Sequence, residues 1–205
     1  MRDWENCYRT GEMPWDKGSP APPLLEMIER HGPGVFGKGP VLVPGCGLGH
    51  DVRAIAGHGI PVIGLDISET ANQQADAIAK SGTEVYELGD YLSPEWCEGR
   101  QFSAIWEHTC FCAIDPALRP AYACSAAAVI EPGGMFTGVF YLTPNGPGEE
   151  MDGPPFNSTI AEIEALFLPH FEKIDAWVPQ NAYPGREGKE WIALFRRLPK
   201  PRVAG

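Results

Sequence analysis

The chain has 205 residues, of which 43% are hydrophobic and 21% charged, and its formal net charge at pH 7 is −11. This composition predicts a single folded domain over residues 1–205 and excludes a largely disordered chain. The negative charge argues against nucleic acid as a partner, because phosphate binding needs a basic surface. No apolar run reaches the roughly 18 residues of a membrane span, and the N-terminus has no apolar signal segment. We therefore expect a cytoplasmic protein that does not enter a membrane.

Six cysteines are present, and none forms a C-x-x-C pair. In the reducing cytosol they are expected to be free thiols. Cys110 and Cys112 would share one face of a strand, but no further Cys/His cluster completes a tetrahedral site. Buried structural thiols are therefore the favoured interpretation, and no metal is predicted. We expect a monomer, with a weak homodimer as the alternative.

The N-terminal segment, residues 1–32, begins with a polar and aromatic stretch that contains Trp4, Tyr8 and Trp15. It continues into a helix predicted over 20–31, which prolines favour at its start and Gly32 ends. Beyond it, short apolar runs alternate with helical stretches. Strands are predicted at 41–43, 61–65, 84–88, 102–106 and 135–142, and helices at 51–57, 69–80 and 116–130. This alternation predicts an α/β fold with a parallel, doubly wound sheet.

The last third of the chain follows a different pattern. A Pro- and Gly-rich stretch at 144–155 is predicted to be a loop over the site, and a helix follows at 159–167. Two strands, at 171–178 and 191–197, are joined by a Gly- and Pro-rich loop with no helix between them. Consecutive strands of this kind predict an antiparallel hairpin at one edge of the sheet.

A glycine-rich turn follows the first predicted strand. Gly45, Gly47 and Gly49 connect that strand to a helix, and Asp66 ends the next strand. Glycine lets the backbone approach a ligand closely, and an acid at the second strand can bind both hydroxyls of a ribose. A structural turn without a ligand is the alternative interpretation of the glycines alone. The strand, turn, helix, strand and acid in register favour a nucleotide-type cofactor.

The spacing of these glycines distinguishes between cofactors. The dinucleotide fingerprint is G-x-G-x-x-G, whereas this chain has G-x-G-x-G with His50 in place of the last glycine of the fingerprint. The pattern suits a cofactor with an amino acid tail in place of a diphosphate. After the third strand, Asp90 and Tyr91 are placed to meet an adenine amino group and ring. The alternative for Asp90 is a role in a turn or as a helix cap.

Several motifs together resemble the thiopurine S-methyltransferase family, which includes plant halide/thiol methyltransferases and bacterial relatives. The motifs are Trp4-Glu5, Met13-Pro14-Trp15-Asp16, Val43-Pro44-Gly45-Cys46-Gly47, Gly64-Leu65-Asp66-Ile67-Ser68, Phe111-Cys112-Ala113-Ile114, Pro132-Gly133-Gly134 and Gly153-Pro154-Pro155-Phe156. The resemblance covers nearly the whole chain and implies a class I methyltransferase (Rossmann-like) fold, a seven-stranded sheet with an antiparallel last strand. It also implies S-adenosyl-L-methionine as cofactor, S-adenosyl-L-homocysteine as its product, and a small-molecule methyl acceptor.

The resemblance also implies roles for individual residues. Gly45 matches a loop contact to the amino acid part of the cofactor, Asp66 matches the ribose acid, and Asp90 with Tyr91 match the adenine contacts. His108 matches a position beside the methionine part of the cofactor. The full predicted cofactor set is Trp4, Tyr8, Trp15, Gly45, Cys46, Gly47, Asp66, Ile67, Asp90, Tyr91, Glu107 and His108.

Some of these positions depart from the family pattern. Trp4, Tyr8 and Trp15 match N-terminal positions that cover the cofactor, although halide/thiol members typically have Trp in place of Tyr8. Glu107 stands where the family often has Asp. His108 stands where halide/thiol enzymes usually carry Tyr and thiopurine enzymes carry Arg. Because this position adjoins the methyl group, the identity of the acceptor stays open.

The residue types also suggest how an acceptor could be activated. A thiol must become a thiolate, so a nearby base would help. His108 is the best candidate, because histidine exchanges a proton readily near neutral pH, and Glu107 is the second catalytic candidate. The alternative is that His108 only contacts the cofactor carboxylate or packs. Arg186 is interpreted as a solvated loop residue rather than as a partner for an acceptor carboxylate, and Phe156 is a further candidate for the site.

The favoured function is S-adenosyl-L-methionine-dependent transfer of a methyl group to a small thiol or a related soft nucleophile. Such acceptors include thiopurines, halides, and selenium or tellurium species. An O- or N-methyltransferase on the same fold is the alternative, since a fold does not fix the acceptor. An NAD(P)-dependent oxidoreductase, which the glycine spacing disfavours, and a non-catalytic cofactor-binding protein are the remaining hypotheses.

Overall fold

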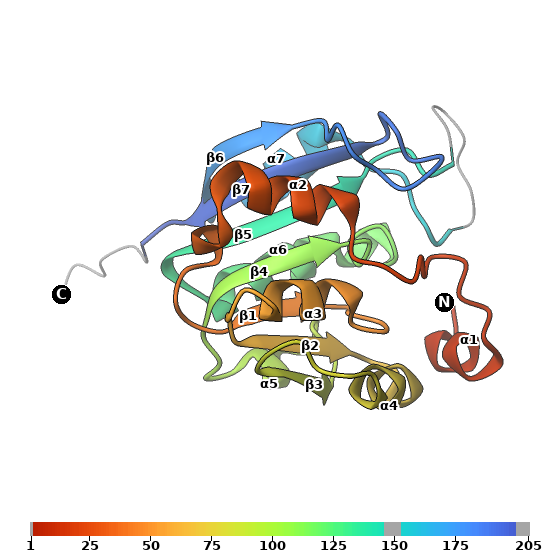
Figure 1. Ribbon diagram of the computed structural model, residues 1–205. Helices are drawn as coiled ribbons and strands as arrows, with labels where there is room; N and C mark the ends of the chain where they lie inside the picture. The colour runs from red at the N-terminus through yellow and green to blue at the C-terminus, as the bar shows by residue number, and fades with distance from the viewer. Residues whose placement is uncertain (1, 146–152, 200–205) are drawn as a thin grey trace.

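A computed structural model describes residues 2–145 and 153–199 of the protein. Its strands form one mixed sheet. The strands are β1 (Val41–Pro44), β2 (Val62–Asp66), β3 (Glu84–Leu88), β4 (Phe102–His108), β5 (Ile130–Tyr141), β6 (Phe171–Trp177) and β7 (Glu190–Arg197). Their order is β3-β2-β1-β4-β5-β7-β6 (Figure 1). Strands β1 to β5 run parallel, whereas β7 runs antiparallel to β5 and β6. The predicted α/β fold with an antiparallel last strand is confirmed.

Helices cover both faces of this sheet (Figure 1). The helices α2 (Pro22–His31), α3 (His50–Ala56) and α4 (Glu69–Ala77) lie on one face, and α5 (Pro94–Cys97), α6 (Arg119–Val129) and α7 (Ile160–Phe167) lie on the other. Each face has its own apolar core, because the central strands present alternate side chains to the two layers. In the part of the chain that is described, none of the helices combines the length and apolar character needed to cross a bilayer.

Some elements differ from the sequence prediction. A short helix, α1 (Trp4–Thr10), lies in the N-terminal stretch for which no helix is predicted, and α5 is a second unpredicted helix. Asp3 caps α1 by accepting the N–H of Asn6, and Gly11 ends it in a left-handed conformation. Strand β5 starts at Ile130 instead of 135, so the predicted turn at 132–134 becomes an irregularity within the strand. Pairing with β4 outweighs the local turn preference of proline and glycine there.

The N-terminal segment is fastened to the carboxyl-terminal side of the sheet, where parallel strands place ligand sites. Glu5 on α1 accepts a hydrogen bond from the hydroxyl of Ser68 at 2.6 Å and another from the hydroxyl of Thr70. Both donors lie at the start of α4. Further along the segment, Oδ1 of Asp16 lies 2.9 Å from Nε2 of His50, at the start of α3. The segment is therefore attached to both helices that follow the first two strands.

The loop between β6 and β7 lies beside the same segment. The hydroxyl of Tyr183 donates to the carbonyl oxygen of Ser19 at 2.6 Å. Glu26 on α2 accepts hydrogen bonds from Nε1 of Trp177 and from the backbone N–H of Asn181, both at 2.8 Å. Segments from the two ends of the chain thus meet over the sheet. Residues 146–152 of the predicted loop over the site lie outside the described residues.

Candidate active site

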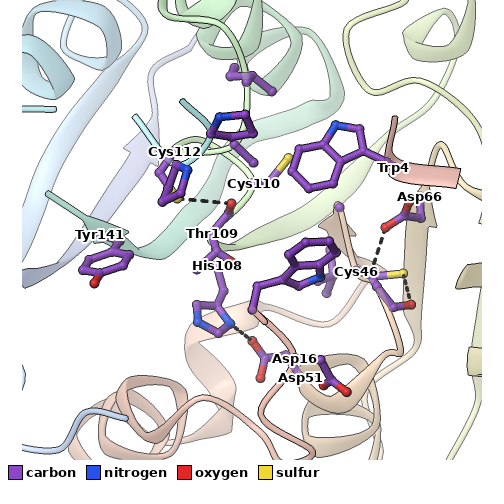
Figure 2. A pocket seen from close by; sticks show the side chains of 18 of the residues that line it. Trp4, Asp16, Cys46, Asp51, Asp66, His108, Thr109, Cys110, Cys112 and Tyr141 are labelled. Atoms are coloured by element: carbon purple, nitrogen blue, oxygen red, sulfur yellow. Dashed lines mark hydrogen bonds and ion pairs between the residues drawn. The ribbon is translucent and has the colours of Figure 1, made fainter. Parts of the chain in front are cut away.

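A cavity of about 570 Å³ opens at the carboxyl ends of β1, β2 and β4, within the range of ligand pockets, about 300–1,000 Å³. Apart from Glu107, all residues predicted for the cofactor site line it. These lining residues are Trp4, Tyr8, Trp15, Gly45, Cys46, Gly47, Asp66, Ile67, Asp90, Tyr91 and His108. Figure 2 shows Trp4 and Asp66 on one side and His108 and Tyr141 on the other.

The glycine turn after β1 exposes backbone to the cavity. Gly47 has a φ of 52°, and a Cβ there would lie 2.7 Å from the hydroxyl oxygen of Tyr8, so a side chain would clash. The N–H of Gly47 donates to Oδ2 of Asp66 at 2.9 Å, and Oδ1 accepts the N–H of Ser68 at 3.0 Å. Burial raises the pKa of Asp66, and these N–H donors oppose that shift. Both contacts hold the Asp66 carboxyl at the cavity wall.

Aromatic side chains of the N-terminal segment form one side of the cavity. Trp15 packs edge-on against Trp4 and Tyr8, with ring centroids 5.3 Å and 5.8 Å apart. Its Nε1 atom donates to the hydroxyl oxygen of Tyr8 at 3.3 Å. Such rings shield a ligand from water and attract a cation through their π faces.

The two residues predicted to contact adenine occupy different environments. Asp90 is exposed, and its Oδ1 accepts the N–H of Leu92 at 2.8 Å, which is the turn role given as its alternative. Tyr91 is buried and packs edge-on against Tyr122. The hydroxyl of Tyr91 has no hydrogen-bond partner in the described part of the chain. Ile67, also at the wall, is 54% exposed and offers apolar surface.

Asp51, in the first turn of α3, fixes the orientation of His108. Its Oδ2 lies 2.9 Å from Nδ1 of His108 (Figure 2). The same oxygen accepts Nε1–H of Trp106 at 2.8 Å, and Oδ1 accepts the N–H of Ala21 at 2.7 Å. Burial acts to raise the pKa of Asp51, but His108 and these donors hold it below its usual value. Because an ionised carboxylate can only accept, Nδ1 carries the hydrogen and Nε2 of the neutral ring is an acceptor.

Arg186 lies in the loop before β7 and is only 8% exposed, so its predicted solvated position is wrong. Its guanidinium carbon lies 4.6 Å from the centre of the Tyr141 ring. Its Nη1 atom donates to Oε1 of Glu190 at 3.2 Å and lies 3.4 Å from Nε2 of His108. The Glu190 carboxylate offsets the charge of the buried guanidinium. The guanidinium group of Arg186, paired with Glu190, stands at the cavity wall beside His108.

Glu107 and His108 face opposite sides of β4, since successive side chains of a strand point to opposite faces. Glu107 is fully buried, accepts the N–H of Phe111 at 2.8 Å and accepts the hydroxyl of Tyr122. Burial raises the pKa of Glu107 to about 7, and the hydrogen bonds from Tyr122 and Phe111 oppose the shift. The side chain does not line the cavity, so its position does not support the predicted contact with cofactor or acceptor.

Other residues at the wall have no role in the sequence analysis. Asp51, Tyr141 and Tyr183 all line the cavity. Asp51 could be found from the sequence, because it begins the helix that follows the glycine turn. No comparable pattern marks Tyr183. Phe156, the further candidate, does not line the cavity, although the two preceding residues, Pro154 and Pro155, do.

The fold and this cavity define a class of protein. A glycine turn after the first strand and an acid at the end of the second are the features that bind a nucleoside-containing cofactor. Five aspartates and seven Trp or Tyr rings are among the residues of the wall, and they suit a cofactor that carries a positive sulfonium group. The cavity and these residues fit S-adenosyl-L-methionine. The arrangement is that of a class I S-adenosyl-L-methionine-dependent methyltransferase.

Comparison with known proteins identifies the family. A sequence model described as Thiopurine S-methyltransferase matches residues 1–193. The chain is 32% identical over 199 residues to probable thiol methyltransferase 2 of Arabidopsis thaliana, covering 95% of this chain and 84% of that protein. It is 26% identical over 186 residues to thiopurine S-methyltransferase of Marinobacter nauticus, covering 82% of each. The chain belongs to the thiopurine S-methyltransferase family, and it is an S-adenosyl-L-methionine-dependent methyltransferase.

Solved structures share the fold. The chain matches the 1,6-didemethyltoxoflavin-N1-methyltransferase of Burkholderia thailandensis, solved with 1,6-didemethyltoxoflavin and S-adenosylhomocysteine, with a TM-score of 0.72 and 19% identity over 96% of this chain and 86% of that one. A structure from work on conversion of a disulfide into a thioacetal in echinomycin biosynthesis gives a TM-score of 0.73 and 23% identity over 95% and 91%. At these identities the likeness shows the fold alone.

Proposed function

We propose that this enzyme methylates a small thiol or a related soft nucleophile, in a site whose acceptor side is formed by His108 and Arg186. The main support is the bond between Asp51 and Nδ1 of His108, because it leaves Nε2 able to accept a proton at the cavity wall. Relatives named as thiol, thiocyanate and thiopurine methyltransferases support a sulfur acceptor.

The protein contributes mainly alignment and exclusion of water. When bound, S-adenosyl-L-methionine supplies the electrophilic methyl group. Asp66 and the turn at Gly45 and Gly47 hold the cofactor, and Trp4 and Trp15 shield it from solvent. Oriented binding of this kind provides much of the rate gain in a displacement between two bound reactants.

The residues on the acceptor side accept a proton and stabilise a negative charge. With a thiol, the S–H proton passes to Nε2 of His108, and the thiolate keeps the electron pair that forms the new bond to carbon. Asp51 stabilises the imidazolium that results. Arg186 places its positive charge next to the thiolate. An acceptor that is already an anion needs Arg186 but no base.

A methyl-transfer screen over thiols, thiopurines, halides, selenite, phenols and amines tests the proposal. We expect thiols and other soft nucleophiles to be methylated; turnover confined to phenols or amines would establish the O- or N-methyltransferase alternative. In His108→Phe, thiol turnover should fall by about 10²-fold or more while cofactor affinity is kept. His58→Phe, at an exposed histidine, is the matched control. Full thiol turnover by His108→Phe at every pH would remove the role of His108 as a base.

We also propose a cytoplasmic location and a monomeric state, with weak dimerisation as the alternative. All six cysteines are unpaired, which supports a reducing compartment. Light scattering across a concentration series tests the oligomeric state. A constant dimer mass at micromolar protein concentrations would contradict the proposed monomer. Fractionation of cells that express the protein tests its location.

A further inference from the structure

We propose that Glu107 is a positioning residue, whose carboxyl group holds the turn at residues 108–112 (the post-β4 turn) in the conformation that forms the acceptor side of the cavity. The inference rests on the proposed function, because the turn begins at His108. It also replaces the catalytic role considered for Glu107 by an indirect one.

The post-β4 turn contains backbone strain. Among the non-glycine residues that the structure describes, Thr109 alone has a positive φ, which is 63°. This left-handed conformation is unfavourable for L-residues and is a genuine outlier for a β-branched one. Such a residue persists only where surrounding contacts fix it, and strain of this kind clusters at functional sites. Here, Thr109 and its neighbours His108, Cys110 and Cys112 line the cavity.

The carboxyl group of Glu107 provides the fixing contacts. One oxygen accepts the N–H of Phe111 inside the turn at 2.8 Å, and the other accepts the hydroxyl of Tyr122 on α6. The sheet makes room for this side chain, since Glu107 is paired with Gly138 on β5 and a Cβ at Gly138 would lie 2.5 Å from Cβ of Glu107. The turn is thereby tied through Glu107 to a helix of the core.

The Phe111 side chain holds the turn from the same side. Its ring packs edge-on against Tyr122 at 5.6 Å and Phe140 at 5.3 Å between centroids. The ring anchors Phe111 in the core, and Glu107 fixes the direction of its N–H. Loss of the Glu107 carboxyl group would leave the Phe111 N–H and the Tyr122 hydroxyl without their acceptor, which costs stability as well as geometry. The place of this carboxyl group at a strained turn beside the acceptor indicates a role in geometry.

Glu107→Gln and Glu107→Leu separate this role from others. Glutamine can still accept the N–H of Phe111 and donate to the hydroxyl of Tyr122, whereas leucine fills the space without polar contacts. We expect Glu107→Leu to raise the acceptor KM and lower kcat, reducing kcat/KM by about 10²-fold, because a small misplacement of reacting groups has effects of that size. Glu107→Gln should recover kcat/KM to within about fivefold of the wild type.

Two measurements do not depend on turnover. Calorimetry should give an S-adenosyl-L-homocysteine affinity within about threefold of the wild type in both variants, since the Glu107 carboxyl group makes its hydrogen bonds to Phe111 and Tyr122 and not to Asp66 or the glycine turn. Hydrogen exchange should show the Phe111 amide protected in the wild type and in Glu107→Gln, and faster in Glu107→Leu. Tyr122→Phe, which removes one of the two contacts, should give an intermediate rate even if Glu107→Leu fails to fold. Glu98→Gln, at an exposed glutamate, is the matched control.

The outcomes separate failure of this inference from failure of the proposed function. Wild-type kinetics in Glu107→Leu, or unchanged exchange at Phe111, would overturn the positioning role. If Glu107→Gln folds and is as impaired as Glu107→Leu, the charge itself is needed and the role is not positioning. If the wild type methylates no thiol or soft nucleophile, but hydrogen exchange at the Phe111 amide changes in the Glu107 variants as expected, the proposed acceptor is wrong. The role of Glu107 in holding the turn would still be supported.

Discussion

Nη1 of Arg186 lies 3.4 Å from Nε2 of His108, although 78 residues separate them in the chain. A guanidinium N–H can only donate, so this contact requires Nε2 to be the acceptor nitrogen. The bond from Nδ1 to Asp51 selects the same tautomer independently. A proton acceptor and a fixed positive charge therefore lie side by side at the cavity wall.

Removing the charge of Arg186 should weaken acceptor binding. We expect the double variant Arg186→Met/Glu190→Gln to raise the acceptor KM by about 10- to 100-fold. The variant loses one charge-assisted hydrogen bond to the acceptor, which contributes about 1.5–3 kcal/mol to binding. Affinity for S-adenosyl-L-homocysteine should stay unchanged. The single variant Arg186→Met leaves Glu190 buried without its partner and should cost about 3–5 kcal/mol of stability. Steady-state kinetics and urea unfolding measure both effects, and an unchanged KM in the double variant contradicts the role of Arg186.

Asp51→Asn should affect acceptors that carry a proton. The asparagine amide group can donate to Nδ1, which favours the other tautomer and removes the acceptor at Nε2. We expect kcat for a thiol to fall by about 10²-fold or more, as in other histidine sites that lose their orienting carboxylate. Turnover of an acceptor that is already an anion should change much less. Equal losses for both kinds of acceptor would show that Asp51 acts on folding and not through His108.

Glu107 should make stability depend on pH. Burial raises the pKa of this carboxyl from its usual 4.5 to about 7, so the folded protein binds the proton more tightly than the unfolded chain does. The stabilisation is complete below the unfolded pKa and is lost as pH rises through the folded pKa. We expect the free energy of unfolding of the wild type, relative to Glu107→Gln, to fall by up to about 3 kcal/mol between pH 5 and pH 8. Urea titrations at both pH values measure it, and a pH-independent difference counts against the shift.

Gly47→Ala should weaken cofactor binding, because its φ is 52° and the new Cβ would lie 2.7 Å from the hydroxyl oxygen of Tyr8. We expect affinity for S-adenosyl-L-homocysteine to fall by about tenfold or more, equal to about 1.4 kcal/mol. Gly99→Ala is the matched control, since Gly99 also has positive φ but no atom near the position of a Cβ. Adding Tyr8→Phe should restore part of the affinity. Calorimetry that shows equal affinity for Gly47→Ala and the wild type would rule out this close approach.

The fold followed from the sequence because its strongest patterns are local. The apolar runs that became β1 to β4 are short and flanked by turns, and they alternate with helices, which is enough to define a parallel sheet. Helix α1 was missed because only seven residues form it, although Asp3 and Gly11 provide capping residues. The start of β5 was missed because proline and glycine at 132–134 favour a turn locally, while the pairing partner on β4 is distant in sequence.

The residues on the two sides of the cavity differ in how well they could be predicted from the sequence. The cofactor side follows strand ends, so Gly47 and Asp66 could be placed from spacing alone. The acceptor side depends on how the loop between β6 and β7 packs, and nothing local to Arg186 indicates that this loop covers the cavity. Strand alternation alone could have shown that of Glu107 and His108 only one side chain can face the ligand.

The strand order also determines when the site is completed during biosynthesis. Strand β7 lies between β5 and β6, so the segment that becomes β6 leaves the ribosome before the neighbour it pairs with in the sheet. Trp4 emerges well before Arg186 and Glu190. A nascent chain that stalls before β7 has the glycine turn, Asp66 and His108, but it lacks Glu190 and the strand that hold Arg186 in place. Methyl transfer therefore has to await the synthesis of β7, and fragments that lack β7 should be inactive.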